Sequence, residues 1–305
     1  MDASRSTRSA GLPLRPADAV ILGGSSLLIL LAVVFQGRME NPWPVVGRHA
    51  LYLSLYLASV AALRLLRPKG IRFLLRTASV QIMYLQIYLT SRDLQLLFFA
   101  WNDDTVLRWE GALFDVQPLV WIQKLYSPLL SDWMFFVYVA YVVFYPLLAA
   151  VIFFRHGEEA NEDYLFRLGL INIVCGLGFI LFPVMGPLHW DKVRDLLTEP
   201  LPVRGFGHAA EYIRMNYHAP GGTIPSPHCA AATVMWFTSL KYTRWGFWAL
   251  APVILSVYVS TVYGRFHYFS DMVIGIAAAV PVLLLSPGLQ RAWNRWAGTR
   301  PAESP

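Results

Sequence analysis

Apolar residues occur along this chain in long blocks, not in alternation with polar residues. Eight blocks approach the roughly 17–25 residues that a helix needs to cross a bilayer. They are residues 19–35, 50–66, 73–89, 133–154, 168–184, 226–240, 247–262 and 269–285. Because lipid offers the backbone no hydrogen-bond partners, such blocks satisfy their peptide groups within helices. The pattern predicts an all-α, polytopic membrane helical bundle of about eight transmembrane helices.

Two regions depart from this regular pattern. The third block is interrupted by Arg76, Gln81 and Gln86, so it is the least apolar of the predicted spans. Residues 92–131 hold a short apolar run followed by amphipathic sequence, which predicts a segment lying along the membrane surface. No stretch between the blocks is long enough to form a separate soluble domain.

The composition supports a membrane protein and excludes some other classes. The 305 residues are 56% hydrophobic and only 14% charged, whereas soluble domains carry about 25% charged residues. The formal net charge of +6 lies mainly in loops and termini. No basic stripe with interleaved aromatics predicts a nucleic-acid partner. Cys175 and Cys229 lie in or beside apolar blocks, so we expect two free buried thiols and no disulfide framework.

Lysine and arginine residues predict the orientation, because cytoplasmic loops of membrane proteins are enriched in them. They gather at the N-terminus and after the second, sixth and eighth predicted spans: Arg5, Arg8 and Arg15; Arg64, Arg67, Lys69, Arg72 and Arg76; Lys241 and Arg244; Arg291, Arg295 and Arg300. The loop after the fourth span would lie on the same side and is acidic, but acidic residues count little in this rule. Both termini are therefore predicted to be cytoplasmic. The predicted organisation is a cytoplasmic tail (1–16), N-terminal transmembrane helices (17–90), a membrane core (91–290) and a cytoplasmic C-terminal tail (291–305).

His267 and Asp271 lie at i and i+4, so on a helix they share one face. A carboxylate in that position can accept a hydrogen bond from one ring nitrogen and leave the other nitrogen as a nucleophile. A buried His–Asp pair that only tethers two helices is the alternative. Ionisable residues in a membrane segment favour the functional interpretation.

His228 follows Ser226 and Pro227, which are typical of a helix start with Ser at the N-cap and Pro in the first turn. Free N–H groups in such a turn favour an anion such as phosphate. Taken alone, the motif equally fits a capped structural helix. Two membrane crossings separate His228 from His267, so we expect both histidines on one face, away from the cytoplasm.

The two motifs together resemble a known family. Pro225-Ser226-x-His228 and His267-x-x-x-Asp271 are similar to the second and third signatures of the type 2 phosphatidic acid phosphatase superfamily. The resemblance covers roughly residues 100–285. It implies a phosphatase/phosphotransferase-type membrane core of six helices, with the first two spans as an addition.

Within that superfamily the chain resembles the inositol phosphorylceramide synthase-like (inositolphosphotransferase) branch. One feature is the His-Tyr-x-x-Asp form at His267-Tyr268. The other is an upstream stretch that includes Asp104, Glu110 and Pro118, with Trp121 and Gln123 following. This branch implies transfer of a phospho-headgroup, such as phosphoinositol, onto a lipid hydroxyl. Hydrolysis of phosphatidate or a polyprenyl diphosphate stays open as the alternative.

The resemblance implies a mechanism without a metal or other cofactor. His267 would attack phosphorus and form a phosphohistidine, with Asp271 orienting its ring. His228 would protonate the leaving oxygen and then deprotonate the acceptor, water or an alcohol. Ser226 would help to hold the phosphoryl oxygens. Membrane lipids are the expected substrates, and the oligomeric state is not predicted.

The cations of the family pattern are only partly present. The arginine that precedes the third-signature histidine falls here on Thr261, which leaves Arg265 as the available cation. The first signature, a lysine and an arginine ahead of a proline, is absent in that form. Lys192 and Arg194 are candidates to bind the phosphate instead. Charged side chains that simply face solvent in a loop are an equally good explanation of both residues. The same two interpretations apply to Arg204 and Arg214.

Two other classes stay open. In a zinc-dependent membrane hydrolase, His228, His267 and Asp271 would supply three ligands and water the fourth; inhibition by a chelator would identify it. A transporter or scaffold would need no chemistry at all. The chain lacks the paired broken-helix repeats of many transporters, and function retained without His267 would favour this class.

Overall fold

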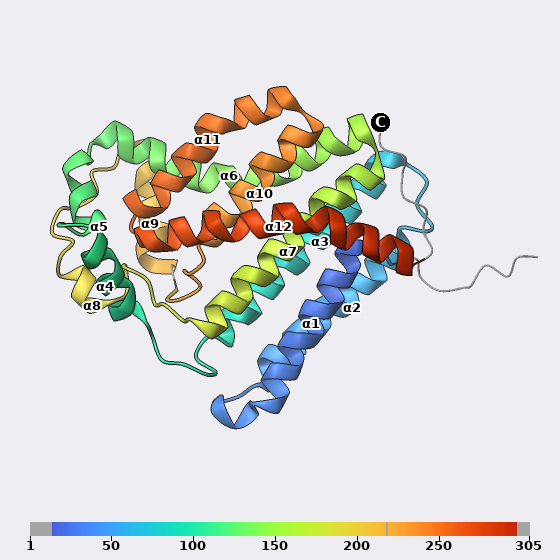
Figure 1. The fold of residues 1–305 in the computed structure, drawn as a ribbon, viewed down its shortest axis with the longest axis horizontal. Coiled ribbons are helices and arrows are strands. Elements are labelled where there is room, and N and C mark those ends of the chain that lie inside the picture. The colour runs from blue at the N-terminus through green and yellow to red at the C-terminus, as the bar shows by residue number, and fades with distance from the viewer. Residues whose placement is uncertain (1–13, 218, 298–305) are drawn as a thin grey trace, which may run out of the picture.

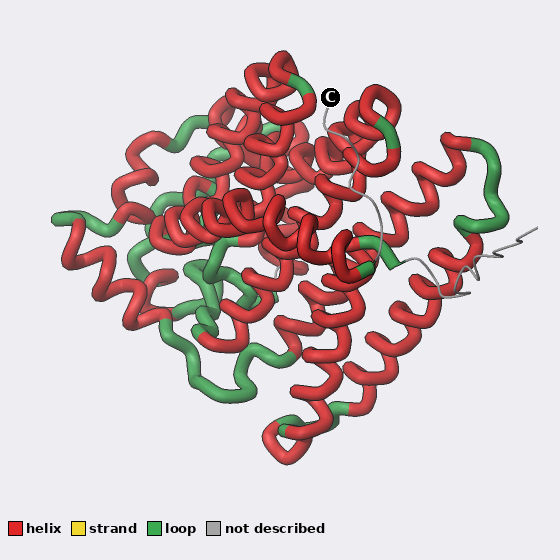
Figure 2. The backbone as a smooth tube through the Cα atoms, turned by 45° about the vertical axis from the view of Figure 1, so that its right-hand side comes forward, coloured by secondary structure: helices red, strands yellow, loops and turns green. Residues whose placement is uncertain are grey.

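The computed structural model describes residues 14–217 and 219–297, and within these ranges it is helical with no strand (Figure 2). All eight apolar blocks fold as helices: α1 (Pro16–Val34), α2 (Trp43–Ala62), α3 (Lys69–Asp93), α6 (Pro128–His156), α7 (Glu158–Leu181), α10 (Pro227–Tyr242), α11 (Arg244–Tyr263) and α12 (Phe269–Trp296). The prediction of an all-α polytopic bundle is confirmed.

Six of these helices are long and apolar enough to cross a membrane: α1, α2, α6, α7, α11 and α12. They identify the chain as an integral membrane protein. The other two differ for separate reasons. Helix α3 has 25 residues but carries charged side chains. Helix α10 has 16 residues, and at 1.5 Å per residue it reaches only about 24 Å, less than the roughly 30 Å hydrocarbon core.

Helix α7 forms the centre of the bundle and packs against α1, α3, α6, α10 and α12 (Figure 1). Small residues allow α3 to approach it closely. A Cβ atom at Gly176 would lie 2.5 Å from Ser91 Oγ, and one at Gly169 would lie 2.9 Å from Tyr84 Cζ. Close backbone approach at small residues is typical of membrane helix packing.

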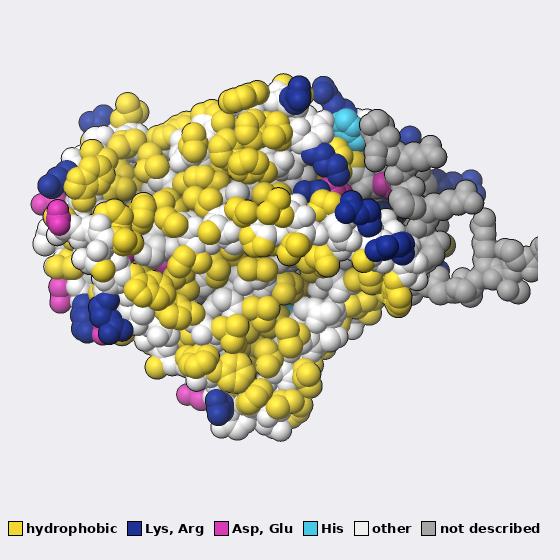
Figure 3. All heavy atoms as spheres, in the orientation of Figure 1, with side chains coloured by type: hydrophobic (Ala, Val, Ile, Leu, Met, Phe, Trp, Pro, Cys, Tyr) yellow, Lys and Arg dark blue, Asp and Glu magenta, His cyan; other side chains and the backbone are white. Residues whose placement is uncertain are grey.

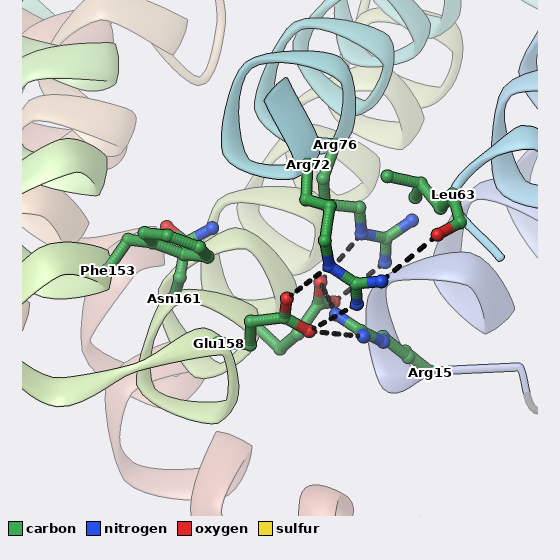
Figure 4. A pocket seen from close by; sticks show the side chains of 8 residues that line it. Arg15, Leu63, Arg72, Arg76, Phe153, Glu158 and Asn161 are labelled. Atoms are coloured by element: carbon green, nitrogen blue, oxygen red, sulfur yellow. Dashed lines mark hydrogen bonds and ion pairs between the residues drawn. The ribbon is translucent and has the colours of Figure 1, made fainter. Parts of the chain in front are cut away.

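A group of charged side chains with a buried centre, here called the arginine cluster, joins α1, α3 and α7 at the end where α3 begins. Arg76 binds Asp18 and Glu162, each at 2.6 Å. Three more residues complete the cluster, as Figure 4 shows in part: Arg15, Arg72 and Glu158. The carboxylates neutralise Arg76 inside the protein, which explains how the third apolar block accommodates this residue.

Short helices gather at the opposite end of the bundle (Figure 1). They are α4 (Asp103–Leu113), α5 (Pro118–Trp121), the 3-10 helix η2 (Ile122–Leu125), α8 (Asp191–Arg194) and α9 (Gly205–Tyr217); another 3-10 helix, η1 (Gln36–Arg38), joins α1 to α2. None of the helices within 92–131 is long enough to cross a membrane, and the surface location of this segment stays a prediction. Helices α8 and α9 lie in a region where the apolar pattern predicted none.

The predicted tails fall mostly outside the described residues, which begin at 14 and end at 297. Arg5, Arg8 and Arg300 lie outside them, so the predicted location of the termini stays a prediction. Helix α12 continues to Trp296, and the described part of the 291–305 segment is therefore mostly helical.

Candidate active site

The two histidine motifs meet at the end of the bundle that carries the short helices. Helix α10 leaves this end, α11 returns to it, and α12 leaves it again. The starts of α10 and α12 touch directly, since the Ser226 N–H donates to the Asp271 carbonyl at 3.0 Å. Gly275 on α12 allows this contact, because a Cβ atom there would lie 2.6 Å from the Ser226 carbonyl oxygen.

His267 and Asp271 form the pair that their spacing predicts. His267 Nδ1 lies 3.3 Å from Asp271 Oδ2, and the Tyr268 N–H donates to the same carboxylate oxygen at 3.1 Å. The backbone N–H of His267 donates to the Thr261 carbonyl at 3.0 Å. His267 is only 3% exposed and Asp271 is fully buried. With Nδ1 directed at the carboxylate, Nε2 is the ring nitrogen left for chemistry.

His228 lies beside His267 at the start of α10. Their ring centroids are 5.6 Å apart and the ring planes make an angle of 62°. The His228 ring stacks on Tyr138 at 4.5 Å, and Tyr138 stacks in turn on Phe266 at 3.9 Å. Tyr138 therefore fixes the plane of His228. No sequence motif marks Tyr138, since it is one of many aromatics in an apolar block.

The N-cap of α10 is formed as predicted. Ser226 is fully buried and its Oγ accepts a hydrogen bond from the Cys229 N–H at 3.4 Å. Gly221 and Gly222, just upstream, both have positive φ angles, 88° and 70°. The Gly222 N–H donates to the Gln95 side chain at 3.1 Å. These contacts fix the loop that leads into His228.

Asp103, at the start of α4, joins the 183–187 turn to the loop between α11 and α12 (residues 264–268), which carries His267 and is here called the catalytic loop. Its carboxylate accepts hydrogen bonds from the N–H groups of Met185 and Gly186 at 2.8 and 2.9 Å, and from the Tyr268 hydroxyl at 2.9 Å. Burial raises the pKa of Asp103, and these hydrogen bonds oppose the rise. Through the last of these hydrogen bonds, Asp103 holds Tyr268, the residue that follows His267. No sequence motif marks Asp103, although it adjoins the stretch that resembles the synthase branch.

Glu110, on α4, contacts the first turn of α12. Its Oε1 accepts from the Ser270 N–H at 2.8 Å and from the Ser270 hydroxyl at 3.1 Å. Burial raises the pKa of Glu110, and the hydrogen bonds from Ser270 oppose the rise. The two α4 carboxylates therefore hold the helix start that carries His267 and Asp271.

Arg265, the predicted substitute for the family's arginine, is buried and already engaged. Its Nε donates to the Tyr126 hydroxyl at 3.0 Å, and its Nη2 donates to the Glu199 carbonyl. Its φ angle of 63° is the only positive one at a described residue other than glycine. Strained backbone of this kind clusters at functional sites. Its predicted contact with substrate stays a prediction.

Lys192 and Arg194, the other predicted phosphate ligands, lie on α8. Lys192 binds Asp104 at 2.6 Å and Arg194 binds Asp191 at 2.7 Å. Both side chains are largely exposed, at 66% and 62%. Their predicted role in binding phosphate remains untested.

The geometry gives the zinc alternative no support. Within the described residues, no group of three or more His, Cys, Asp or Glu side chains is placed to hold a metal ion. The Asp271 carboxylate faces Nδ1 of His267, as expected for a residue that orients the ring.

The fold and the site define an integral membrane protein with a pair of histidines at one end of a helical bundle. A family model described as the PAP2 superfamily matches residues 104–285, which include both histidine motifs. The match spans more than half of the chain, and the chain belongs to this superfamily. Searches of curated proteins and of solved structures found no match. Membership supports a function of the lipid phosphatase or phosphotransferase type.

Gly275→Ala is expected to separate the two motifs. The added Cβ would clash with the Ser226 carbonyl, which is backbone and cannot move freely. We expect a loss of about 1–3 kcal/mol in unfolding free energy and a clear fall in activity. Gly288→Ala is the matched control on the same helix, because nothing lies within 4 Å of its Cβ position. Equal melting temperatures and activities for the two variants in detergent would contradict the close contact.

Proposed function

We propose that this protein is a lipid phosphotransferase that works through a phosphohistidine at His267. It passes a phospho-headgroup of the phosphoinositol kind to a lipid hydroxyl. The observation that carries the proposal is the 5.6 Å separation of the His228 and His267 rings, with Asp271 on the far nitrogen of His267. A nucleophile oriented by a carboxylate, beside a second group that can move a proton, is what two-step group transfer requires.

In the first step, Nε2 of His267 attacks phosphorus and the bond from phosphorus to the leaving oxygen breaks. His228 gives that oxygen its proton. In the second step, His228 takes the proton of the acceptor hydroxyl, whose oxygen attacks phosphorus, and the N–P bond of His267 breaks. The first turn of α10 lies at the positive end of the helix dipole, which suits the negatively charged phosphoryl oxygens.

The transfer to an alcohol is supported by residues that carry the resemblance to the synthase branch. They border the catalytic loop. Glu110 binds Ser270, the Phe114 ring lies 5.2 Å from the Phe269 ring, and Gln123 Oε1 accepts from Arg265 at 3.5 Å. A stretch that merely linked helices would not need these contacts.

We place the histidines on the extracytoplasmic side. Support comes from basic residues near the other end of the bundle, at the α2–α3 loop, the α10–α11 loop and the end of α12: Arg64, Arg67, Lys69, Lys241, Arg244, Arg291 and Arg295. Figure 3 shows hydrophobic side chains along the middle of the molecule and a gathering of Lys and Arg toward the end of α12. Cytoplasmic loops carry such an excess.

Purified protein in detergent with EDTA tests the proposal. Phosphatidylinositol or phosphatidate, with labelled phosphorus, is supplied with and without ceramide or diacylglycerol. We expect label to move from phosphatidylinositol to the lipid acceptor, since no metal takes part in the proposed steps. Release of free phosphate alone would instead identify a lipid phosphatase. Loss of all activity in EDTA would favour the zinc hydrolase.

A further inference from the structure

The end of α3 contacts the loop that leads into His228. This loop, residues 219–226, lies between α9 and α10 and ends at the N-cap of α10. Residues 221–226 are all buried, and buried peptide groups need hydrogen-bond partners. Two side chains at the end of α3, far earlier in the chain, supply such partners.

Gln95 binds the loop at two points. Its side-chain N–H donates to the Pro220 carbonyl at 3.4 Å, and its side-chain oxygen accepts from the Gly222 N–H at 3.1 Å. These two hydrogen bonds enclose Gly221, where an added Cβ atom would overlap the Gln95 side chain. Gly221 and Gly222 both have positive φ angles, so glycine is needed at both positions for this close approach.

Arg92, in the last turn of α3, adds a third hydrogen bond. Its Nη2 donates to the same Pro220 carbonyl at 3.1 Å. Its side chain also packs against Gly222, where an added Cβ atom would lie 2.7 Å from Arg92 Cδ. The guanidinium lies 5.7 Å from the centre of the Tyr88 ring, which orients it. Arg92 and Gln95 are here called the α3 clasp.

The same loop carries His228 into the site. Its last residue, Ser226, donates its N–H to the Asp271 carbonyl at 3.0 Å, and His228 follows in the first turn of α10. Only the buried segment 221–226 lies between the α3 clasp and this turn. Because packed interiors transmit strain, a shift of the loop at the clasp would move the His228 ring.

We infer that Arg92 and Gln95 are positioning residues of the active site, which hold the loop that sets the place of His228. The inference rests on the proposed function, in which His228 gives the leaving oxygen its proton. Both residues lie outside residues 104–285, the part of the chain that the family model matches. The helices that precede the family core therefore contribute to catalysis through α3.

Gln95→Met keeps the size of the side chain and removes both of its hydrogen bonds to the loop. We expect the first turnover of phosphatidylinositol to slow by about 10²-fold, the scale of a misplacement of about 1 Å. The first-turnover release of p-nitrophenolate from p-nitrophenyl phosphate needs no proton from His228, so it should slow much less. The ratio of the two rates therefore falls.

Gln86→Met is the matched control. Gln86 is a buried glutamine of α3 that donates to the Thr90 hydroxyl at 3.0 Å. Both variants lose hydrogen bonds of a buried glutamine, so a loss of stability alone would affect them alike. We expect Gln86→Met to keep the wild-type ratio of the two rates. An equal fall with both substrates in Gln95→Met, or the same fall in the ratio in Gln86→Met, would overturn the inference.

Two further variants test whether the clasp acts through His228. Arg92→Lys should preserve the ratio better than Arg92→Met, because an ammonium group can still donate to the Pro220 carbonyl. In a His228→Ala background, Gln95→Met should slow phosphatidylinositol turnover no further, since both changes remove the same step. A full additional loss in the double variant would contradict the inference.

Hydrogen exchange of the 219–228 segment, followed by mass spectrometry, needs no turnover. Gln95→Met is expected to speed exchange in this segment, and Gln86→Met is not. Unchanged exchange in Gln95→Met would overturn the inference directly. Full phosphatidylinositol turnover in His228→Ala would instead refute the proposed function, while the exchange rates would still decide whether the α3 clasp holds the loop.

Discussion

His267→Ala is expected to reduce kcat by about 10⁴-fold or more, the scale seen when a catalytic nucleophile is removed. The ring lies beside His228 and is oriented by a fully buried carboxylate. Without it, no N–P bond can form and the two-step route is lost. Steady-state turnover of labelled phosphatidylinositol, measured in detergent with EDTA, checks the result.

His208→Ala is the matched control, because His208 is an exposed histidine on α9. We expect its turnover to stay within about twofold of the wild type, as for most surface substitutions. His228→Ala should also be slow with lipid substrates, but less so with p-nitrophenyl phosphate, whose leaving group needs no proton. An activity of His267→Ala within tenfold of the wild type would refute the nucleophile assignment.

Arg76→Met is expected to lower the unfolding free energy by about 3–5 kcal/mol, the second large effect. The substitution leaves Asp18 and Glu162 buried without the cation that both bind at 2.6 Å. Removing one partner of a buried ion pair costs this much because the remaining charge is uncompensated. Unfolding by a denaturing detergent, followed by circular dichroism, measures the loss.

An exposed ion pair between neighbouring helices provides the control. Arg48 on α2 binds Asp93 on α3, and the two side chains are 42% and 38% exposed. Arg48→Met is expected to change the unfolding free energy by less than about 1 kcal/mol. An equal loss of unfolding free energy in Arg76→Met and Arg48→Met would show that burial does not make the arginine cluster (Figure 4) more stabilising than an exposed ion pair.

The sequence predicts the helical bundle well because long apolar blocks leave the backbone few alternatives in lipid. It does not predict α9, which is short and amphipathic and packs against α6. Nor does it explain Arg76 in α3. The partners of Arg76 lie on α1 and α7, and only the packing of these helices brings the charges together.

At the candidate site, the sequence predicts a contact between residues that lie close together in the chain, but it does not predict contacts between separate helices. The i, i+4 spacing of His267 and Asp271 is enough to predict their pairing. Stacking of Tyr138 on His228 joins α6 to α10, and no sequence motif signals it. Arg265 has a positive φ angle, which residue type alone does not reveal.

The central claim is a covalent intermediate on His267, and trapping it is the most direct test. Protein is mixed with phosphatidylinositol carrying labelled phosphorus, in EDTA, and quenched in alkali within milliseconds, since phosphohistidine is labile to acid. Mass spectrometry then locates the label. The account predicts labelled His267 in the wild type and no label in His267→Ala. When labelled p-nitrophenyl phosphate replaces the lipid, His228→Ala should carry more label than the wild type, because the leaving group of this substrate needs no proton. Steady turnover with no label on His267, or label on another residue, would contradict it.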